Sequence, residues 1–172
     1  MRRRAVLLAA ASALLATGCG AHEETTAAWD PPDADAKAIP ATLSFSGKTI
    51  EGKPYDGSLL AGLPTILWFW APWCATCASE AQSVRDLEEQ YRGKINFLGV
   101  AGMGDNKAMR EFVDDFELHT VPHLDDQAGA IWKKFKINQQ SLYVVLDQNG
   151  KVRKTGYMDD LQLTAEVKSL AV

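Results

Sequence analysis

The chain has 172 residues, of which 47% are hydrophobic and 23% charged. This length and composition suffice for one hydrophobic core with tails, but not for two substantial domains. Lys and Arg number 18 against 22 Asp and Glu, so the formal net charge is -4. With no basic stripe or base-reading motif, this charge argues against a nucleic-acid-binding protein.

The first 18 residues have the features of an export signal. Three arginines precede an apolar run from Ala5 to Ala16, which is too short to cross a membrane and has the length of a signal-peptide core. The segment that ends at Cys19, Leu-Ala-Thr-Gly-Cys, resembles the bacterial lipobox. We therefore expect residues 1–18 to be removed and Cys19 to carry lipid. Ordinary secretion without lipid stays open, because Ala16 stands where the lipobox usually has Leu.

Lipidation of Cys19 would anchor the protein at the outer face of the cell membrane, because two or more acyl chains give stable binding. Residues 19–40 are rich in small, acidic and proline residues without apolar periodicity, so we expect a disordered tether. With Cys19 used for lipid, the three cysteines of the chain leave one pair, Cys74 and Cys77. An exported pair stands in an oxidising compartment, where it can cycle between thiol and disulfide.

The domain expected over residues 41–172 begins with extended chain at Thr42–Phe45, followed by turns and one helical turn at Ser58–Leu60. The continuous apolar run Pro64–Trp70 contains β-branched and aromatic residues and predicts a central strand buried on both faces. Cys77–Tyr91 then carries apolar residues at helical spacing, which predicts a helix.

The second half of the domain repeats the strand-helix order and ends with a hairpin and a helix. The further predicted elements are a strand at Ile95–Val100, a helix at 105–116, an extended segment at Pro122–Asp126, a short helix at Ala128–Phe135, strands at Leu142–Leu146 and Lys151–Gly156 joined by an Asn-Gly turn, and a helix from Asp159 or Asp160 to Leu170. Strand-helix-strand units imply parallel strands and the hairpin adds antiparallel ones. The predicted fold class is therefore α/β, with a mixed central sheet flanked by helices on both faces and chemistry where a central strand meets a helix.

The most specific motif, Trp-Ala-Pro-Trp-Cys-Ala-Thr-Cys, runs from Trp70 to Cys77. Cys74 stands at the start of the predicted helix, where unpaired N–H groups and the helix dipole stabilise a thiolate. We expect Cys74 to be the exposed nucleophile and Cys77, one turn deeper, to resolve the mixed disulfide. A zinc site is a weaker alternative, because only His119 and His123 could complete it; we expect both histidines on the surface or in loops. An inert structural bridge is weaker too, since so small a loop constrains little entropy.

Two side chains near this motif are further candidates. Glu80 follows Cys77 by one helical turn and could accept the proton of its thiol, although the periodicity also fits a charged residue on a solvated face. Trp73 is expected to shield the sulfur atoms and contact partners, whereas the aromatic residues 68–70 are expected in the core.

The motif W-A-P-W-C-x-x-C after an apolar strand resembles the thioredoxin superfamily, in particular its exported TlpA-, ResA- and DsbE-like members. The resemblance covers roughly residues 42–170 and continues through Glu80, Pro122–Asp125, Ile131-Trp132, Phe135 and Asp147–Gly150. It implies a thioredoxin fold, a redox-active disulfide between Cys74 and Cys77, a functional role for Glu80 and no organic cofactor.

The chain departs from this family at three positions where proline is usual, namely Thr76, Gln82 and Ser141. Ser141 stands at the family's cis-proline, which implies that Gln140 and Ser141 present backbone groups to a bound substrate. Either the Gln140–Ser141 bond is cis at a cost of about 2.5 to 4 kcal/mol, or the loop is trans and reshaped. Trp68 replaces an Asp that many thioredoxins bury, which shifts proton transfer toward Glu80 or water.

The predicted function is that of an enzyme, a thiol:disulfide oxidoreductase that acts on the thiols or disulfides of exported proteins and is recycled by a membrane redox partner. The hydroxyl of Thr76 could donate a hydrogen bond to a sulfur, which favours a DsbE-like oxidase. The alternative is a TlpA- or ResA-like reductase for cytochrome c maturation or copper-site assembly. An alternative of another class is a non-enzymatic metal-binding module that uses the reshaped loop at Ser141.

Overall fold

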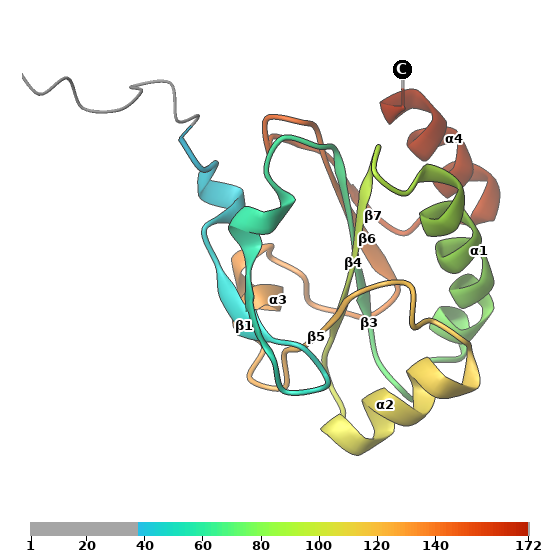
Figure 1. Ribbon diagram of the computed structural model, residues 1–172. Coiled ribbons are helices and arrows are strands. Elements are labelled where there is room, and N and C mark those ends of the chain that lie inside the picture. The colour runs from blue at the N-terminus through green and yellow to red at the C-terminus, as the bar shows by residue number, and fades with distance from the viewer. Residues whose placement is uncertain (1–37, 172) are drawn as a thin grey trace, which may run out of the picture. The chain divides into compact units, whose positions relative to one another are not determined.

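In the computed structural model, which describes residues 38–171, a five-stranded sheet lies between two layers of other elements (Figure 1). The helical elements are η1 Ala41–Leu43, η2 Gly57–Leu60, α1 Ala75–Tyr91, α2 Asn106–Asp115, α3 Ala130–Lys134 and α4 Asp160–Leu170. The strands are β1 Ser46–Lys48, β2 Pro54–Asp56, β3 Thr65–Trp70, β4 Asn96–Ala101, β5 His123–Asp125, β6 Leu142–Leu146 and β7 Val152–Gly156.

The strand order in the large sheet is β5-β4-β3-β6-β7. Strands β3, β4 and β5 pair in parallel, whereas β6 pairs antiparallel with both β3 and β7. The carboxyl ends of β3 and β4 and the amino end of β6 therefore meet at one edge of the sheet. The predicted α/β class with a mixed central sheet is confirmed, and the fold is of the thioredoxin type.

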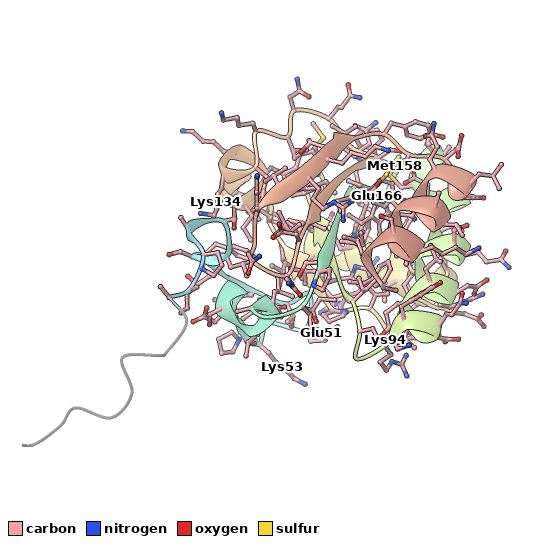
Figure 2. The ribbon with its side chains drawn as sticks, turned by 90° about the horizontal axis from the view of Figure 1, so that it is seen from above. Glu51, Lys53, Lys94, Lys134, Met158 and Glu166 are labelled. Carbon is pink, nitrogen blue, oxygen red and sulfur yellow. A yellow bond between two sulfur atoms is a disulfide. The ribbon has the colours of Figure 1, made fainter. Side chains whose placement is uncertain are left out.

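Two hydrophobic cores lie on the two faces of the sheet. All six residues of β3 are buried, and they alternate between the faces. Trp68 and Trp70 join the core that α1, α2 and α4 cover, and Phe69 joins the core under α3 and the N-terminal elements. Figure 2 shows these layers from above, with Lys134 of α3 on one side of the sheet and α4 on the other.

Most predicted elements are present, with shifted boundaries. The prediction of extended chain over Thr42–Phe45 was wrong: a 3-10 turn occupies Ala41–Leu43, and the first strand starts at Ser46. Helix α1 starts two residues before the prediction, because the sulfur of Cys74 caps it by accepting a hydrogen bond from the Cys77 backbone N–H at 3.0 Å.

The predicted signal segment, Cys19 and nearly all of the predicted tether lie outside the described residues. Within residues 38–171, no helix is long and apolar enough to cross a membrane. The proposed division of the chain at residues 18 and 40 is therefore still a prediction.

Candidate active site

The two cysteines of the motif form a disulfide at the amino end of α1, just beyond the carboxyl end of β3. Their Cα atoms are 5.2 Å apart. Cys77 is 0% exposed and Cys74 is 5% exposed, so only Cys74 retains surface that a partner sulfur could approach. The first turn of α1 contains no acidic residue that would oppose a thiolate at Cys74.

A pocket of about 430 Å³ opens beside Cys74. Its lining residues are Cys74, Thr76, Gln139, Gln140, Ser141 and Tyr157. The structure thus places Gln140 and Ser141, which the sequence nominated for substrate binding, in the same pocket as Cys74. Tyr157 and Gln139 were missed, because no local pattern links them to the cysteine motif.

The loop that ends at Ser141 has a trans backbone, since no cis peptide bond occurs in residues 38–171. The reshaped alternative is therefore the one observed. Ser141 adopts φ 61°, a left-handed conformation that is unfavourable for a residue with a side chain. Its backbone N–H donates to the carbonyl of Phe69 at 2.8 Å, which ties the loop to β3 at the same edge as the disulfide.

Glu80 is buried beneath this loop, with 3% of its surface exposed. Its Oε2 accepts a hydrogen bond from Trp68 Nε1 at 2.9 Å, and its Oε1 accepts one from Ser141 Oγ at 2.5 Å. The alternative of a charged residue on a solvated helix face is therefore wrong. Glu80 and Cys77 lie three residues apart on α1, so they share one face of the helix.

The pKa of Glu80 is raised, because burial disfavours the carboxylate more than its hydrogen-bond donors favour it. Ser141 and Trp68 lower the pKa, and so does the nearby hydroxyl of Tyr143. A buried carboxyl with a raised pKa can carry a proton under conditions where an exposed Glu would be ionised. Trp68, in the position where many thioredoxins bury an Asp, thus supplies a hydrogen-bond donor to this carboxyl.

Trp73 projects from the loop before α1 with 60% of its surface exposed. Its Nε1 donates a hydrogen bond to the carbonyl of Met103 at 2.6 Å, which fixes the indole across the β4–α2 connection. Met103 is itself exposed, so both apolar side chains are accessible at the surface. The role of Trp73 in shielding the sulfur atoms and contacting partners is still a prediction.

His123 is buried in the structure, contrary to the expectation of a surface or loop residue. Its Nδ1 accepts a hydrogen bond from Trp70 Nε1 at 3.2 Å, and its Nε2 faces the Leu118 carbonyl at 3.3 Å. These contacts fit a neutral ring that carries its proton on Nε2. Burial lowers the pKa of His123 to about 4. In the described part of the chain, no three His, Cys, Asp or Glu side chains are grouped so as to hold a metal ion.

Comparison with known proteins places this geometry in a family. A family model described as Redoxin matches residues 34–171. Soluble secreted antigen MPT53 of Mycobacterium tuberculosis is 35% identical over 115 residues, which are 67% of this chain and 65% of that protein. The chain therefore spans slightly less than two thirds of that relative.

Two solved structures are similar over almost their whole length. The structure of MTB DsbF in mixed oxidized and reduced forms has a TM-score of 0.72 and 40% identity, and covers 77% of this chain and 98% of DsbF. A secreted Mycobacterium tuberculosis disulfide oxidoreductase, described as homologous to E. coli DsbE, has a TM-score of 0.68 and 32% identity, with 75% and 98% covered. The chain therefore belongs to the Redoxin family and has a thioredoxin fold, and it is similar to known thiol:disulfide oxidoreductases.

Proposed function

We propose that the protein catalyses disulfide exchange through Cys74 and Cys77 and that it inserts disulfides into exported proteins. One observation carries the proposal: the disulfide lies at the amino end of α1, with Cys74 bordering an open pocket and Cys77 fully buried behind it. This is the geometry that exchange requires, since one sulfur must be reachable and its partner must be close but shielded.

The reaction would begin when a substrate thiolate attacks Cys74 Sγ. The bond between Cys74 and Cys77 breaks, and Cys77 leaves as a thiolate that must take up a proton. A second substrate thiolate then attacks the substrate sulfur of the mixed disulfide, and Cys74 leaves as a thiolate. The substrate has then lost two electrons to the cysteine pair. A membrane redox partner would have to take these electrons in order to restore the Cys74–Cys77 disulfide.

Glu80 is the group that would exchange this proton with Cys77. It lies on the same face of α1, it is buried, and burial raises its pKa. In its protonated form it can give a proton to the leaving thiolate of Cys77, and in the reverse direction its carboxylate can accept one. Ser141 would couple this step to substrate binding, because it both lines the pocket and donates to Glu80.

The direction of an oxidase is supported by groups that stabilise the reduced form. The Cys77 N–H donates to Cys74 Sγ, and the amino end of α1 favours negative charge on that sulfur. A stabilised thiolate makes the disulfide a better oxidant. The hydroxyl of Thr76, which the sequence nominated for this role, makes no hydrogen bond to either sulfur among the described residues. The similarity to a secreted disulfide oxidoreductase supports an extracytoplasmic site of action.

We further propose that Cys19 is lipidated and that residues 1–18 are removed as a signal peptide. The mature protein would then act at the outer face of the cell membrane. Mass spectrometry of the mature amino terminus tests this proposal directly. Cys19→Ala should move the protein from the membrane fraction to the soluble exported fraction, and an unchanged distribution would contradict lipid anchoring.

The test of the activity uses a reduced, unfolded protein with two cysteines as substrate. The oxidised wild-type protein should form the substrate disulfide, and Cys74→Ser should be inactive. When the substrate is supplied with its disulfide already formed, the Cys74 thiolate of Cys77→Ser should attack it, displace one substrate thiolate and accumulate as a mixed disulfide at Cys74. If the wild-type protein instead only reduces substrate disulfides when a dithiol is supplied, the oxidase assignment is wrong and the reductase alternative holds. If it does neither, disulfide exchange is not its function.

A further inference from the structure

We infer that Tyr143 is a positioning residue for Glu80: its buried hydroxyl is a third hydrogen-bond donor to the carboxylate during proton transfer to and from Cys77. This inference rests on the proposed role of Glu80. Tyr143 was not among the residues that the sequence nominated, because it stands in the middle of an ordinary apolar strand, β6.

The register of the sheet brings Tyr143 to Glu80. Tyr143 on β6 lies directly opposite Trp68 on β3, so both side chains project from the same face, toward α1. Ser141, two residues before Tyr143, also sends its side chain to that face. Two of these three residues already donate to Glu80, and Tyr143 is the third polar group in the same buried space.

The Tyr143 hydroxyl is the unsatisfied member of this group. The side chain is 0% exposed, and its oxygen makes no hydrogen bond of acceptable geometry with any residue that the structure describes. It nevertheless lies close enough to Glu80 to favour the ionised carboxylate. Buried hydroxyl groups nearly always have a partner, so a small movement of either side chain should complete this bond.

Glu80 has room for a third donor. A carboxylate offers about four lone-pair sites, and Trp68 and Ser141 occupy one site on each oxygen. The other titratable groups that face Tyr143 are Tyr157 and Asp160, and both are exposed to solvent. Glu80 is therefore the buried titratable group that can accept from the hydroxyl.

Tyr143 acts as a donor throughout the ordinary pH range. Burial, as the largest cause, and the adjacent Glu80 raise its pKa well above the usual value of 10.0. A phenol that stays protonated can donate to the carboxylate form of Glu80 and so favours that form over the protonated one. Removal of the hydroxyl should therefore raise the pKa of Glu80.

The experiment follows the side-chain carboxyl carbon of Glu80 by NMR titration in protein labelled with ¹³C-glutamate, with Glu80→Gln to assign the signal. Tyr143→Phe removes only the hydroxyl and should raise the pKa of Glu80 by about one unit, equivalent to about 1.4 kcal/mol. Tyr55→Phe is the matched control, because Tyr55 lies on β2 outside the central sheet, and it should leave the titration unchanged. An unchanged titration in Tyr143→Phe overturns the inference.

Kinetics separate a positioning role from a structural one. The rate of attack by a small thiol on the disulfide, expressed per thiolate, should show a limb due to Glu80 that moves to higher pH in Tyr143→Phe. Glu80→Gln should remove the limb, and the double variant should behave like Glu80→Gln. An equal effect of Tyr143→Phe in both backgrounds would show that the hydroxyl acts independently of Glu80 and would overturn the inference.

A measurement on the wild-type protein avoids any dependence on folding of the variant. The ring carbon that bears the Tyr143 hydroxyl should change its ¹³C shift as Glu80 titrates, because the hydrogen bond weakens when the carboxylate is protonated. A signal that ignores the titration of Glu80 refutes the contact. These titrations do not require turnover, so they can support the hydrogen bond even if the exchange assay refutes the proposed function.

Discussion

Replacement of Glu80 by Gln should separate the speed of disulfide exchange from the stability of the fold. The amide of Gln is almost the same size and can still accept a hydrogen bond from Trp68 and donate one to Ser141 Oγ. It cannot exchange a proton with Cys77. General acid–base groups typically contribute at least about 100-fold, so we expect a loss of about 100-fold in the step that protonates the Cys77 thiolate.

Although the exchange rate of Glu80→Gln should fall, the stability of its fold should stay equal or rise. The pKa of Glu80 is raised in the folded protein, so its contribution to stability is fully present below its unfolded pKa and is lost as pH rises through its folded pKa. Glu80→Gln removes the titrating group, so this loss of stability at high pH should disappear. Urea unfolding should therefore show equal or greater stability than wild type at pH 8 and a weaker dependence on pH.

The matched control is Glu88→Gln on the same helix. Glu88 is also buried, but its carboxylate pairs with Arg92 at 2.7 and 2.9 Å, two turns away from Glu80. Stopped-flow tryptophan fluorescence of reduction by a small thiol measures the rate in both variants. An equal rate in Glu80→Gln and wild type, or an equal loss in Glu88→Gln, would refute the proposed role of Glu80.

Three further variants test the structure around the site. Ser141→Gly should be more stable than Ser141→Ala by about 1 kcal/mol, because both variants lose the hydroxyl but only glycine adopts φ 61° without strain. Equal midpoints of urea unfolding for the two variants would contradict this. His123 has a folded pKa of about 4 against an ordinary value of 6.5, so the free energy of unfolding should fall by about 3 kcal/mol as the pH drops from 6.5 to 4. His123→Gln should remove this part of the pH dependence of stability, and an unchanged pH dependence would show that the ring is not buried in the neutral form. Asp126→Ala should cost about 3 kcal/mol, because its buried carboxylate accepts the first three N–H groups of α3, and a loss below about 1 kcal/mol in thermal or urea unfolding would show that water replaces it.

Local patterns were sufficient to predict the strands of the central sheet and the helices that flank it, but not the pair β1 and β2. The apolar run of β3 is buried at all six positions, and the Asn-Gly turn joins β6 to β7 through Gly150 at φ 73°. The boundaries of α1 could not be read as accurately, because the capping group is the sulfur of Cys74 rather than one of the usual oxygen side chains.

The surroundings of Glu80 could not be predicted from local pattern. A carboxylate at a helical position suggests solvent, yet Glu80 falls on the buried face of α1 between Cys77 and Val84. Its donors Trp68 and Ser141 are 12 and 61 residues away along the chain, so only the folded sheet brings them together. His123 is a similar case, because its partner Trp70 lies 53 residues earlier.

The measurement that tests the account most directly is the reduction potential of the Cys74 and Cys77 pair, determined in glutathione buffers by tryptophan fluorescence with Cys74→Ser as the control. The proposed oxidase requires a value of about -180 mV or higher, near that of protein disulfide isomerase. A value of about -270 mV, near that of thioredoxin, would contradict the oxidase assignment and indicate a reductase that draws electrons from a membrane donor.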